Sequence, residues 1–330
     1  MSPDPANIKW NRRQFLVRTA KAAASIAAAG TAGLWFHDTK GPIQAADEQL
    51  EAGALNFSIK DLNPKMAIVQ GSDRRATLNS AFKALGGIET FIKKEDRVLL
   101  KVNAAFASPS MLSATTHPEI VSEIARLCYK AGAASVAVTD NPINNPSSCF
   151  TLSGIDAAAR AAGARVYLPD IDAFKPFTVK QAKLIRNWPV LLDPLKNISK
   201  VIGLAPVKDH HRSGASLTMK NWYGLLGGRR NIFHQDINTI ITELAMMVRP
   251  TFVILDGTVS MMTNGPTGGS LTDLKQTNTM IVSTDQVAAD AFGATLLDKS
   301  SRDLPFISMA EAAGLGTADY QSLKPEELSV

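Results

Sequence analysis

The sequence has few cysteines, and this scarcity excludes several kinds of site. Only Cys128 and Cys149 occur among the 330 residues. Two thiols can pair in an oxidising compartment, but they cannot supply the cysteine ligands of an iron–sulfur cluster or of a Cys-rich zinc site. We therefore expect no iron–sulfur cluster within this chain. Cys128 falls on an apolar helix face, so we expect it to pack in the core.

Several nucleotide-binding and hydrolase motifs are also missing. No Gly-x-Gly-x-x-Gly follows a predicted strand, and the sequence has no Walker-type phosphate-binding loop. It also lacks the Gly-x-Ser-x-Gly turn of the α/β-hydrolases. These absences argue against a function built on a dinucleotide, a nucleoside triphosphate or a serine elbow.

The formal net charge of +5 comes mostly from the start of the chain. Residues 1–46 hold six of the 35 basic residues but only two of the 30 acidic ones, so residues 47–330 carry a formal charge of +1. A nucleic-acid-binding domain usually concentrates basic residues on its own surface. We therefore expect no nucleic-acid partner.

The N-terminal region resembles a twin-arginine export signal. Its motif is Asn11-Arg12-Arg13-Gln14-Phe15-Leu16, and the 15-residue apolar run Ala22–Phe36 follows. That run is shorter than the roughly 20 residues that span a bilayer. The signal predicts the twin-arginine translocase as a partner and a periplasmic or other extracytoplasmic location. No clean small-x-small cleavage site precedes Asp47, so an uncleaved membrane anchor stays an alternative, as does an ordinary helix after a chance arginine pair.

Short apolar runs alternate with helical patterns after residue 64, which predicts an α/β fold with a mostly parallel sheet and helices on both faces. Glycine-rich loops are expected at the carboxyl ends of the strands. We divide the chain into a leader (1–46), a linker (47–64), an α/β domain (65–300) and a C-terminal extension (301–330). The predicted strands are Met66–Gln70, Arg97–Val102, Ser135–Thr139, Arg165–Leu168, Lys200–Ala205, Thr251–Leu255 and Thr279–Ser283.

Polar residues recur just after the predicted strands. Because parallel strands end at one edge of a sheet, we expect these residues to converge on a ligand site there. The alternative is that they cap helices and keep loops solvated. The residues concerned are Lys101, Asn103, Asp140, Lys208, Asp209, His210, His211, Asp256 and Asp285.

Two short motifs near this edge favour an anionic ligand. Lys101 and Asn103 offer a cation and an amide, which suit a carboxylate or phosphate, although Lys101 could equally extend its ammonium to solvent. Thr116 and His117 precede Pro118 at a predicted helix start, where backbone N–H groups attract anions. Capping alone accounts for Thr116, whereas His117 is less well explained.

Three of the five histidines lie in or beside the polar, glycine-rich segment 208–233. A long irregular segment of this kind usually has a functional role. His210 could act as a general acid or base, assisted by Lys208 and Asp256, while Lys220 and Asn221 bind the ligand. Alternatively, His210 and His234 could bind a divalent metal, but no His-Glu-x-x-His motif supports this reading.

Asp290 is predicted to lie on the buried face of a helix over residues 286–297, together with Val287 and Ala291. A buried carboxylate needs partners. Asp290 could hold a backbone turn or pair with one of the lysines, and the first role is favoured.

Taken together, an ordered set of motifs resembles the family called domain of unknown function 362, over about residues 65–300. Many relatives carry ferredoxin-type cysteine clusters or occur near redox systems, but this chain has no such cluster. It also departs from the family at Val102, where proline is common, so the following loop is expected to differ. The motifs are Lys101-x-Asn103, Thr116-His117-Pro118-Glu119, Asp140-x-Pro142, Lys208-x-His210, Lys220-Asn221-x-x-Gly224, His234, Asp256-Gly257, Gly265-Pro266-x-Gly268 and Asp285-x-Val287-Ala288-x-Asp290.

Two functional hypotheses follow. In the first, the chain is an enzyme of the cell envelope that acts on a small anionic substrate, with or without a divalent metal. In the second, it is a non-catalytic module that binds a cofactor or metal, or assists maturation, for an envelope redox system. An enzyme requires a titratable group that alters the rate, whereas a binding module shows ligand-dependent melting without turnover.

Overall fold

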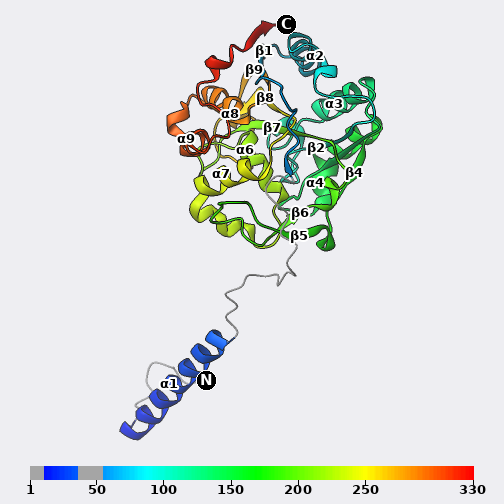
Figure 1. The fold of residues 1–330 in the computed structure, drawn as a ribbon. Coiled ribbons are helices and arrows are strands. Elements are labelled where there is room, and N and C mark those ends of the chain that lie inside the picture. Colours follow the sequence, from blue (N-terminus) through cyan, green and yellow to red (C-terminus); the bar gives the residue numbers. More distant parts are fainter. Residues whose placement is uncertain (1–10, 36–54) are drawn as a thin grey trace, which may run out of the picture. The chain divides into compact units, whose positions relative to one another are not determined.

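The computed structural model describes residues 11–35 and 55–330, and the chain divides into two units, residues 1–44 and residues 45–330. The first unit contains helix α1 (Arg12–Trp35; Figure 1). Residues 12–26 of this helix are exposed. In the described part of the chain, no helix is both long and apolar enough to cross a membrane. The end of the predicted leader and residues 47–54 of the predicted linker lie outside the described residues.

An eight-stranded sheet forms the centre of the second unit, with the order β10-β1-β9-β8-β7-β2-β3-β4. Every neighbouring pair from β8 to β4 is parallel, whereas β9 runs antiparallel to both β8 and β1. The prediction of a mostly parallel sheet is therefore confirmed. The strands are β1 (Met66–Gln70), β2 (Arg97–Lys101), β3 (Ser135–Thr139), β4 (Arg165–Tyr167), β7 (Lys200–Lys208), β8 (Phe252–Met261), β9 (Leu274–Ser283) and β10 (Glu326–Ser329).

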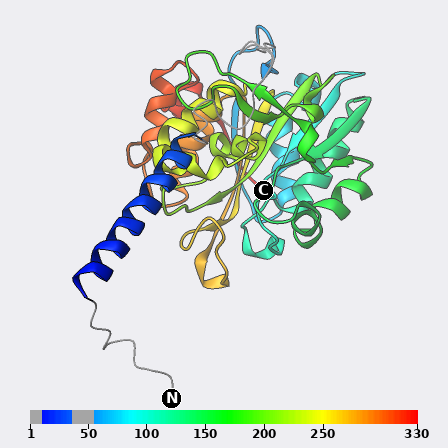
Figure 2. The same cartoon turned by 90° about the horizontal axis from the view of Figure 1, so that it is seen from below.

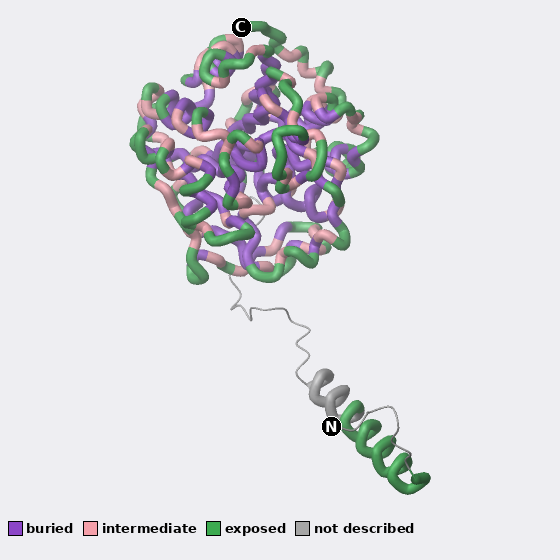
Figure 3. The backbone as a smooth tube through the Cα atoms, turned by 180° about the vertical axis from the view of Figure 1, so that it is seen from behind, coloured by how far each residue is buried: buried purple, intermediate pink, exposed green. Residues whose placement is uncertain are grey.

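Helices cover both faces of this sheet, as predicted, and enclose two layers of core (Figures 1 and 2). Successive strand side chains point to opposite faces, so Leu99 belongs to one layer and its neighbour Leu100 to the other. Figure 3 shows the buried residues gathered in the interior of the second unit, with exposed residues around its outside. One layer is covered by α2 (Arg74–Ala84), α3 (Pro118–Lys130) and α5 (Ile155–Ala161), and the other by α6 (Thr218–Asn221), α7 (Ile237–Met247), α8 (Gln286–Thr295) and α9 (Pro305–Ala312).

Local capping explains where these helices begin. The Asp73 carboxylate accepts hydrogen bonds from the backbone N–H groups of Arg75 and Ala76 at the start of α2. Helix α3 begins at Pro118, as predicted, because proline fits the first helical position and needs no N–H partner there. Such caps place the helix starts, and with them the loops that precede them.

Both cysteines are free and buried, Cys128 in α3 and Cys149 in α4 (Pro146–Leu152). Burial raises the pKa of the Cys128 thiol to about 12, so it stays protonated and packs as a small apolar group. This agrees with the packing role expected for Cys128.

Three features were not expected from the sequence. Residues 170–195 contain a two-stranded antiparallel sheet of β5 (Phe174–Phe177) and β6 (Trp188–Leu191). Strands β7, β8 and β9 are each several residues longer than predicted. Residues 301–330, treated as an extension, contribute α9 and the edge strand β10, which pairs with β1.

The prediction that Asp285 joins the other polar residues is wrong. Asp285 follows β9, and β9 is antiparallel to β8, so its carboxyl end lies at the opposite edge of the sheet. There Asp285 caps α8 by accepting hydrogen bonds from the backbone N–H groups of Val287 and Ala288. A strand pattern in the sequence does not reveal direction, which is why the error arose.

Candidate functional site

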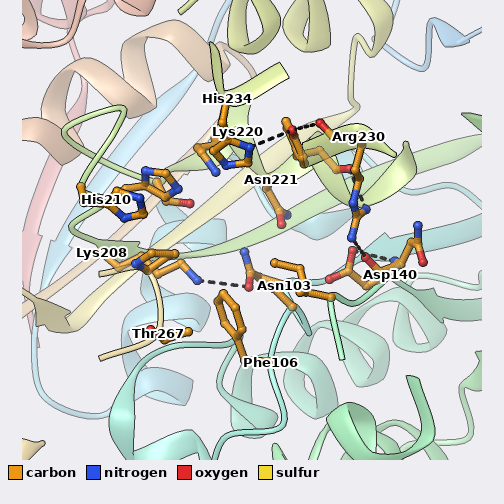
Figure 4. Close-up of a pocket in the computed structure, with 18 residues that line it drawn as sticks. Asn103, Phe106, Asp140, Lys208, His210, Lys220, Asn221, Arg230, His234 and Thr267 are labelled. Atoms are coloured by element: carbon orange, nitrogen blue, oxygen red, sulfur yellow. Dashed lines mark hydrogen bonds between the residues drawn. The ribbon is translucent and has the colours of Figure 1, made fainter. Parts of the chain in front are cut away.

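A pocket of about 340 Å³ lies beyond the carboxyl ends of β2, β3 and β7 (Figure 4). Its other walls come from the segment 208–234 and from residues 266–267 in the loop between β8 and β9. Parallel sheets commonly bind ligands at this position. Eight of the residues predicted for the site line it, namely Asn103, Asp140, Lys208, His210, His211, Lys220, Asn221 and His234.

A buried ion pair supports the pocket from below. Lys101, the last residue of β2, places its Nζ 2.7 Å from Oδ1 of Asp140, and both side chains are almost fully buried. The same Nζ donates hydrogen bonds to the carbonyl oxygens of Val102 (2.7 Å) and Asn221 (2.9 Å). Burial lowers the pKa of Lys101, and the Asp140 carboxylate opposes that shift. Lys101 is therefore already neutralised, and it holds neighbouring segments together beneath the pocket.

Lys208, the last residue of β7, is a second buried cation, and it does line the pocket. Its Nζ donates to the carbonyl oxygen of Ala114 at 2.6 Å and lies 3.4 Å from Oδ1 of Asn103. Burial, followed by repulsion from Lys220, lowers the pKa of Lys208 to about 7. Its hydrogen-bond partners are dipoles, and the charge of Asp140 only partly opposes the shift.

Lys220 in α6 is the third buried lysine. Its exposure is 8%, and its Nζ lies 5.2 Å from the centre of the Tyr223 ring. Burial, followed by repulsion from Arg230, lowers the pKa of Lys220 to about 7. A cation over an aromatic face gains some electrostatic stabilisation, but less than a carboxylate would provide.

Arg230 is a third cation of the pocket wall, and it also connects two segments. Its guanidinium donates to the carbonyl oxygens of Tyr223 and Leu226 at 3.0 Å, and to that of Asn141 at 2.7 Å. Burial lowers the pKa of Arg230, although Asp140 opposes the shift. All of these partners are uncharged, so the wall keeps its positive charge.

Three imidazole rings stack along one side of the pocket. The ring centres of His210 and His211 are 5.0 Å apart with 8° between their planes, and those of His210 and His234 are 5.7 Å apart with 18°. Burial, followed by repulsion from Lys220 and His234, lowers the pKa of His210 to about 2. His210 is therefore neutral at physiological pH.

Hydrogen bonding fixes which nitrogen of His210 carries its proton. Its Nδ1 lies 3.2 Å from the backbone N of Arg212 and 3.3 Å from that of Ser213, so Nδ1 accepts from both. In a neutral ring the proton is then assigned to Nε2. His210 thus has a hydrogen-bond donor to offer, and its acceptor nitrogen is occupied.

The predicted metal ligands His210 and His234 share the pocket, but their arrangement does not resemble a metal centre. Lone pairs of imidazole nitrogens lie in the ring plane, so stacked rings do not direct two of them at one point. Among the described residues, no group of three or more His, Cys, Asp or Glu side chains is placed to hold a metal ion. Metal binding stays a prediction.

Four other predicted residues do not line the pocket. One of them, Asp209, accepts a hydrogen bond from the backbone N of Gly265 and pairs with Nζ of Lys299 at 3.3 Å. Asp256 lies within β8, where its Oδ2 accepts a hydrogen bond from Nε of Arg74 at 2.9 Å. His117 caps α3. Thr116 accepts from the backbone N of Asn103 at 2.7 Å and donates to the carbonyl oxygen of Leu204 at 2.8 Å. Thr116 therefore supports Asn103 but does not itself face the pocket.

Several lining residues were not predicted from the sequence. The most important are the cation Arg230 and the aromatic residues Tyr223 and Phe106. The signal for Arg230 and Tyr223 was their place in the glycine-rich segment that also contains Lys220. Nothing in the local pattern separates Arg230 from its neighbour Arg229. The contact that distinguishes Arg230 is made with Asn141, which is 89 residues away in the sequence.

Comparison with known proteins adds a family and one relative. The family described as domain of unknown function (DUF362) matches residues 98–295. The thylakoid-associated protein sll1697 of Synechocystis is 25% identical over 256 residues, which are 73% of this chain and 75% of that protein.

Two solved structures are distantly similar. A Thermotoga maritima protein has a TM-score of 0.36 at 9% identity over 74% of this chain. The lactate racemase apoprotein of Thermoanaerobacterium thermosaccharolyticum has a TM-score of 0.38 at 10% identity over 73% of this chain. The present chain spans 60% and 57% of these two chains, respectively.

Proposed function

Because the chain belongs to the family domain of unknown function 362, whose name states no reaction, we propose from its pocket that it is an enzyme acting on a small anionic substrate. One observation carries this proposal. Among the described residues lining the pocket there are three cations, Lys208, Lys220 and Arg230, but a single carboxylate, that of Asp140. This carboxylate already pairs with Lys101. A bound carboxylate or phosphate would supply the missing negative charge.

The individual roles follow from the contacts. Lys208 and Lys220 supply charge, and Arg230 keeps the wall positive while it holds the segment around Tyr223 against Asn141. His210 donates a hydrogen bond from Nε2 to the anion or to the atom that gains charge during the reaction. Asn221 serves the framework, because its Nδ2 donates to the carbonyl oxygens of Lys101 and Leu204.

Thermal unfolding in the presence of phosphate, sulfate and acetate tests the anion site. A ligand that binds only the folded chain raises its stability by about 2.7 kcal/mol at 100 times its Kd. We expect such stabilisation for the native chain and its loss in Lys208→Gln and Lys220→Gln. Lys275→Gln, which removes an exposed lysine paired with Asp298, is the matched control and should behave like the native chain. Equal anion responses in all four proteins would contradict the proposal.

Turnover separates an enzyme from a binding module. Solutions of small carboxylates and phosphate esters incubated with the full chain can be followed by NMR for new products. Product formation that disappears in Lys208→Gln supports the enzyme. Anion-dependent stabilisation with no conversion of any tested compound favours the non-catalytic module.

We also propose that the chain is exported by the twin-arginine translocase and works outside the cytoplasm. Support comes from the motif that begins at Asn11 and contains Arg12 and Arg13, and from the exposure of both arginine side chains in α1. Replacing both arginines by lysine keeps the charge but removes the paired guanidinium groups. Cell fractionation should find the native chain in the envelope fraction and the double variant in the cytoplasm. If the double variant is exported equally well, this route is excluded.

A further inference from the structure

The three buried lysines of this region differ in their partners. Lys101 pairs with Asp140 at 2.7 Å, and Lys208 donates to the carbonyl oxygen of Ala114 at 2.6 Å. Within the described part of the chain, Nζ of Lys220 makes no hydrogen bond or ion pair and only lies over the Tyr223 ring. A buried amine without a polar partner, facing a pocket, is placed to react rather than to support the fold.

We infer that Lys220 is a nucleophile that forms an imine with the aldehyde or ketone group of a small carboxylic acid, a substrate class exemplified by the 2-oxo acids. This inference rests on the proposed anion site, because the carboxylate of such a substrate would occupy it. The inference goes further than that proposal in two ways: it names the Lys220 amine as the reacting group of the protein and a carbonyl as the reacting group of the substrate.

The backbone just before Lys220 is held in place by a buried carboxylate. Asp290 in α8 accepts hydrogen bonds from the backbone N atoms of Thr218 (2.8 Å) and Met219 (3.0 Å), the two residues before Lys220. The side chain of Lys220 is then packed against Tyr223. An oriented nucleophile reacts faster because little freedom is lost on reaching the reactive geometry.

The charge state of Lys220 also suits this role. An amine attacks a carbonyl carbon only through its lone pair, so it must be deprotonated. Burial and the charge of Arg230 lower the pKa of Lys220 to about 7, so a substantial fraction of the amine is free at neutral pH, and a bound carboxylate, which raises this pKa, moves imine formation to a more alkaline pH. An exposed lysine has a pKa near 10.4 and is almost entirely protonated there.

The reaction balances without any further reagent. The lone pair of Nζ forms the C–N bond while the carbonyl π electrons move to oxygen. One proton passes from nitrogen to that oxygen and gives a carbinolamine. The C–O bond then breaks, and the hydroxyl leaves as water with the second amine proton. No oxidant or reductant is consumed.

Neighbouring residues are suited to the other requirements of imine formation. The neutral His210 ring, which donates from Nε2, is suited to stabilise the oxygen that becomes negative during attack. Lys208 provides a charge for the carboxylate of the substrate. The pocket volume of about 340 Å³ is at the small end of ligand sites, which fits an acid of a few carbon atoms.

Reductive trapping tests the inference. The full chain is incubated with glyoxylate or pyruvate and cyanoborohydride, which converts an imine into a stable secondary amine, and the modified lysine is located by peptide mass spectrometry. We expect a single dominant adduct on Lys220, slowed by added acetate. Lys220→Arg should lose the adduct, and Lys275→Arg, which changes an exposed lysine, should keep it.

The outcomes separate this inference from the proposed function. Anion stabilisation by acetate without preferential trapping on Lys220 overturns the inference and leaves the anion site intact. Neither stabilisation nor trapping overturns both. Because the adduct is mapped on the native chain, the result does not depend on whether Lys220→Arg folds. Adducts spread evenly over exposed lysines count against the inference.

Discussion

The carboxylate of Asp290, at the buried side of α8, holds the backbone of Thr218 at the start of α6. Its Oδ1 accepts from the Thr218 backbone N at 2.8 Å and also from the Thr218 hydroxyl, while its Oδ2 accepts from the backbone N of Met219 at 3.0 Å. These bonds replace the partners that the first N–H groups of any helix lack. Burial nevertheless raises the pKa of Asp290 to about 7. The helix that presents Lys220 thus depends on a carboxylate from 70 residues further along the chain.

Replacing Asp290 by Asn should weaken both the fold and the anion site. The amide keeps one acceptor but turns an NH₂ group towards a backbone N–H, so one buried donor loses its partner at a cost of about 1–3 kcal/mol. Chemical denaturation should show this loss, and anion-induced stabilisation should decrease with it. Asp298→Asn removes an exposed carboxylate paired with Lys275 and should change the free energy of unfolding by less than about 1 kcal/mol. Similar values for the two variants would contradict the role given to Asp290.

Gly224 should not tolerate a side chain, because it lies against the Lys101–Asp140 ion pair. A Cβ atom at this position would stand 1.8 Å from Oδ1 of Asp140 and 2.7 Å from Nζ of Lys101. Gly224→Ala therefore must displace a buried ion pair, and breaking such a pair costs about 3–5 kcal/mol. Circular dichroism should record a marked fall in melting temperature together with loss of anion binding.

The control for this variant is Gly314→Ala. Gly314 has a φ of +69°, and no described residue has an atom within 4 Å of a new Cβ there, so alanine meets backbone strain without a clash. Its cost should be about 1–2 kcal/mol, without effect on anion binding. If both alanine variants lose stability equally, the ion pair is not what excludes a side chain at Gly224.

Elements that depend on local sequence were predicted well, whereas contacts between distant segments were not. Helix α3 begins at Pro118 as expected, because a helix start is encoded by a proline and a cap within a few residues. Asp256 was expected at a strand end, but β8 continues to Met261 and the carboxylate meets Arg74 from α2. Strand ends and partners of this kind are set by register with neighbouring strands.

The charges in and beneath the pocket likewise depend on contacts that the local sequence does not reveal. The sequence shows that Lys101, Lys208 and Lys220 belong to one region, but it treats them alike. Only the fold reveals that Asp140 neutralises the first, that a carbonyl oxygen binds the second and that an aromatic ring lies beside the third. The chemical difference between three identical side chains comes entirely from packing.

Anion binding should be accompanied by proton uptake at slightly alkaline pH. Lys208 and Lys220 both have a pKa of about 7, so at pH 8 each is largely neutral in the free protein. A bound anion favours the charged form and raises both pKa values. Calorimetry of phosphate or acetate binding at pH 8 in two buffers of different ionisation enthalpy should therefore detect protons taken up.

Because anion binding takes up protons, the affinity for the anion should depend on pH. Below pH 6 both lysines are already charged and no uptake is expected from them. As the pH rises from 7 to 9, the affinity for the anion should fall, because the neutral lysines must then take up protons when the anion binds. The charge of acetate is constant over this pH range, so acetate is the preferred ligand. Affinity that is unchanged from pH 6 to 9 would argue against lysine charges as the source of binding.

Lys220→Met should stabilise the protein while it abolishes anion binding. In the folded state the pKa of Lys220 is about 7, well below the value of about 10.4 in an unfolded chain, so below pH 7 a charged group is buried at a cost. Between pH 7 and 10 the unfolded chain binds more protons than the folded one, so the native protein gains stability from this residue as the pH rises. Methionine has a similar length and no charge, and the variant should gain about 1–3 kcal/mol at pH 6.5 but little at pH 9.5. Urea unfolding at the two pH values measures the difference. A variant that is less stable than the native chain at pH 6.5 would mean that Lys220 stabilises the fold, and its placement as a reactive amine without a partner would then lose its basis.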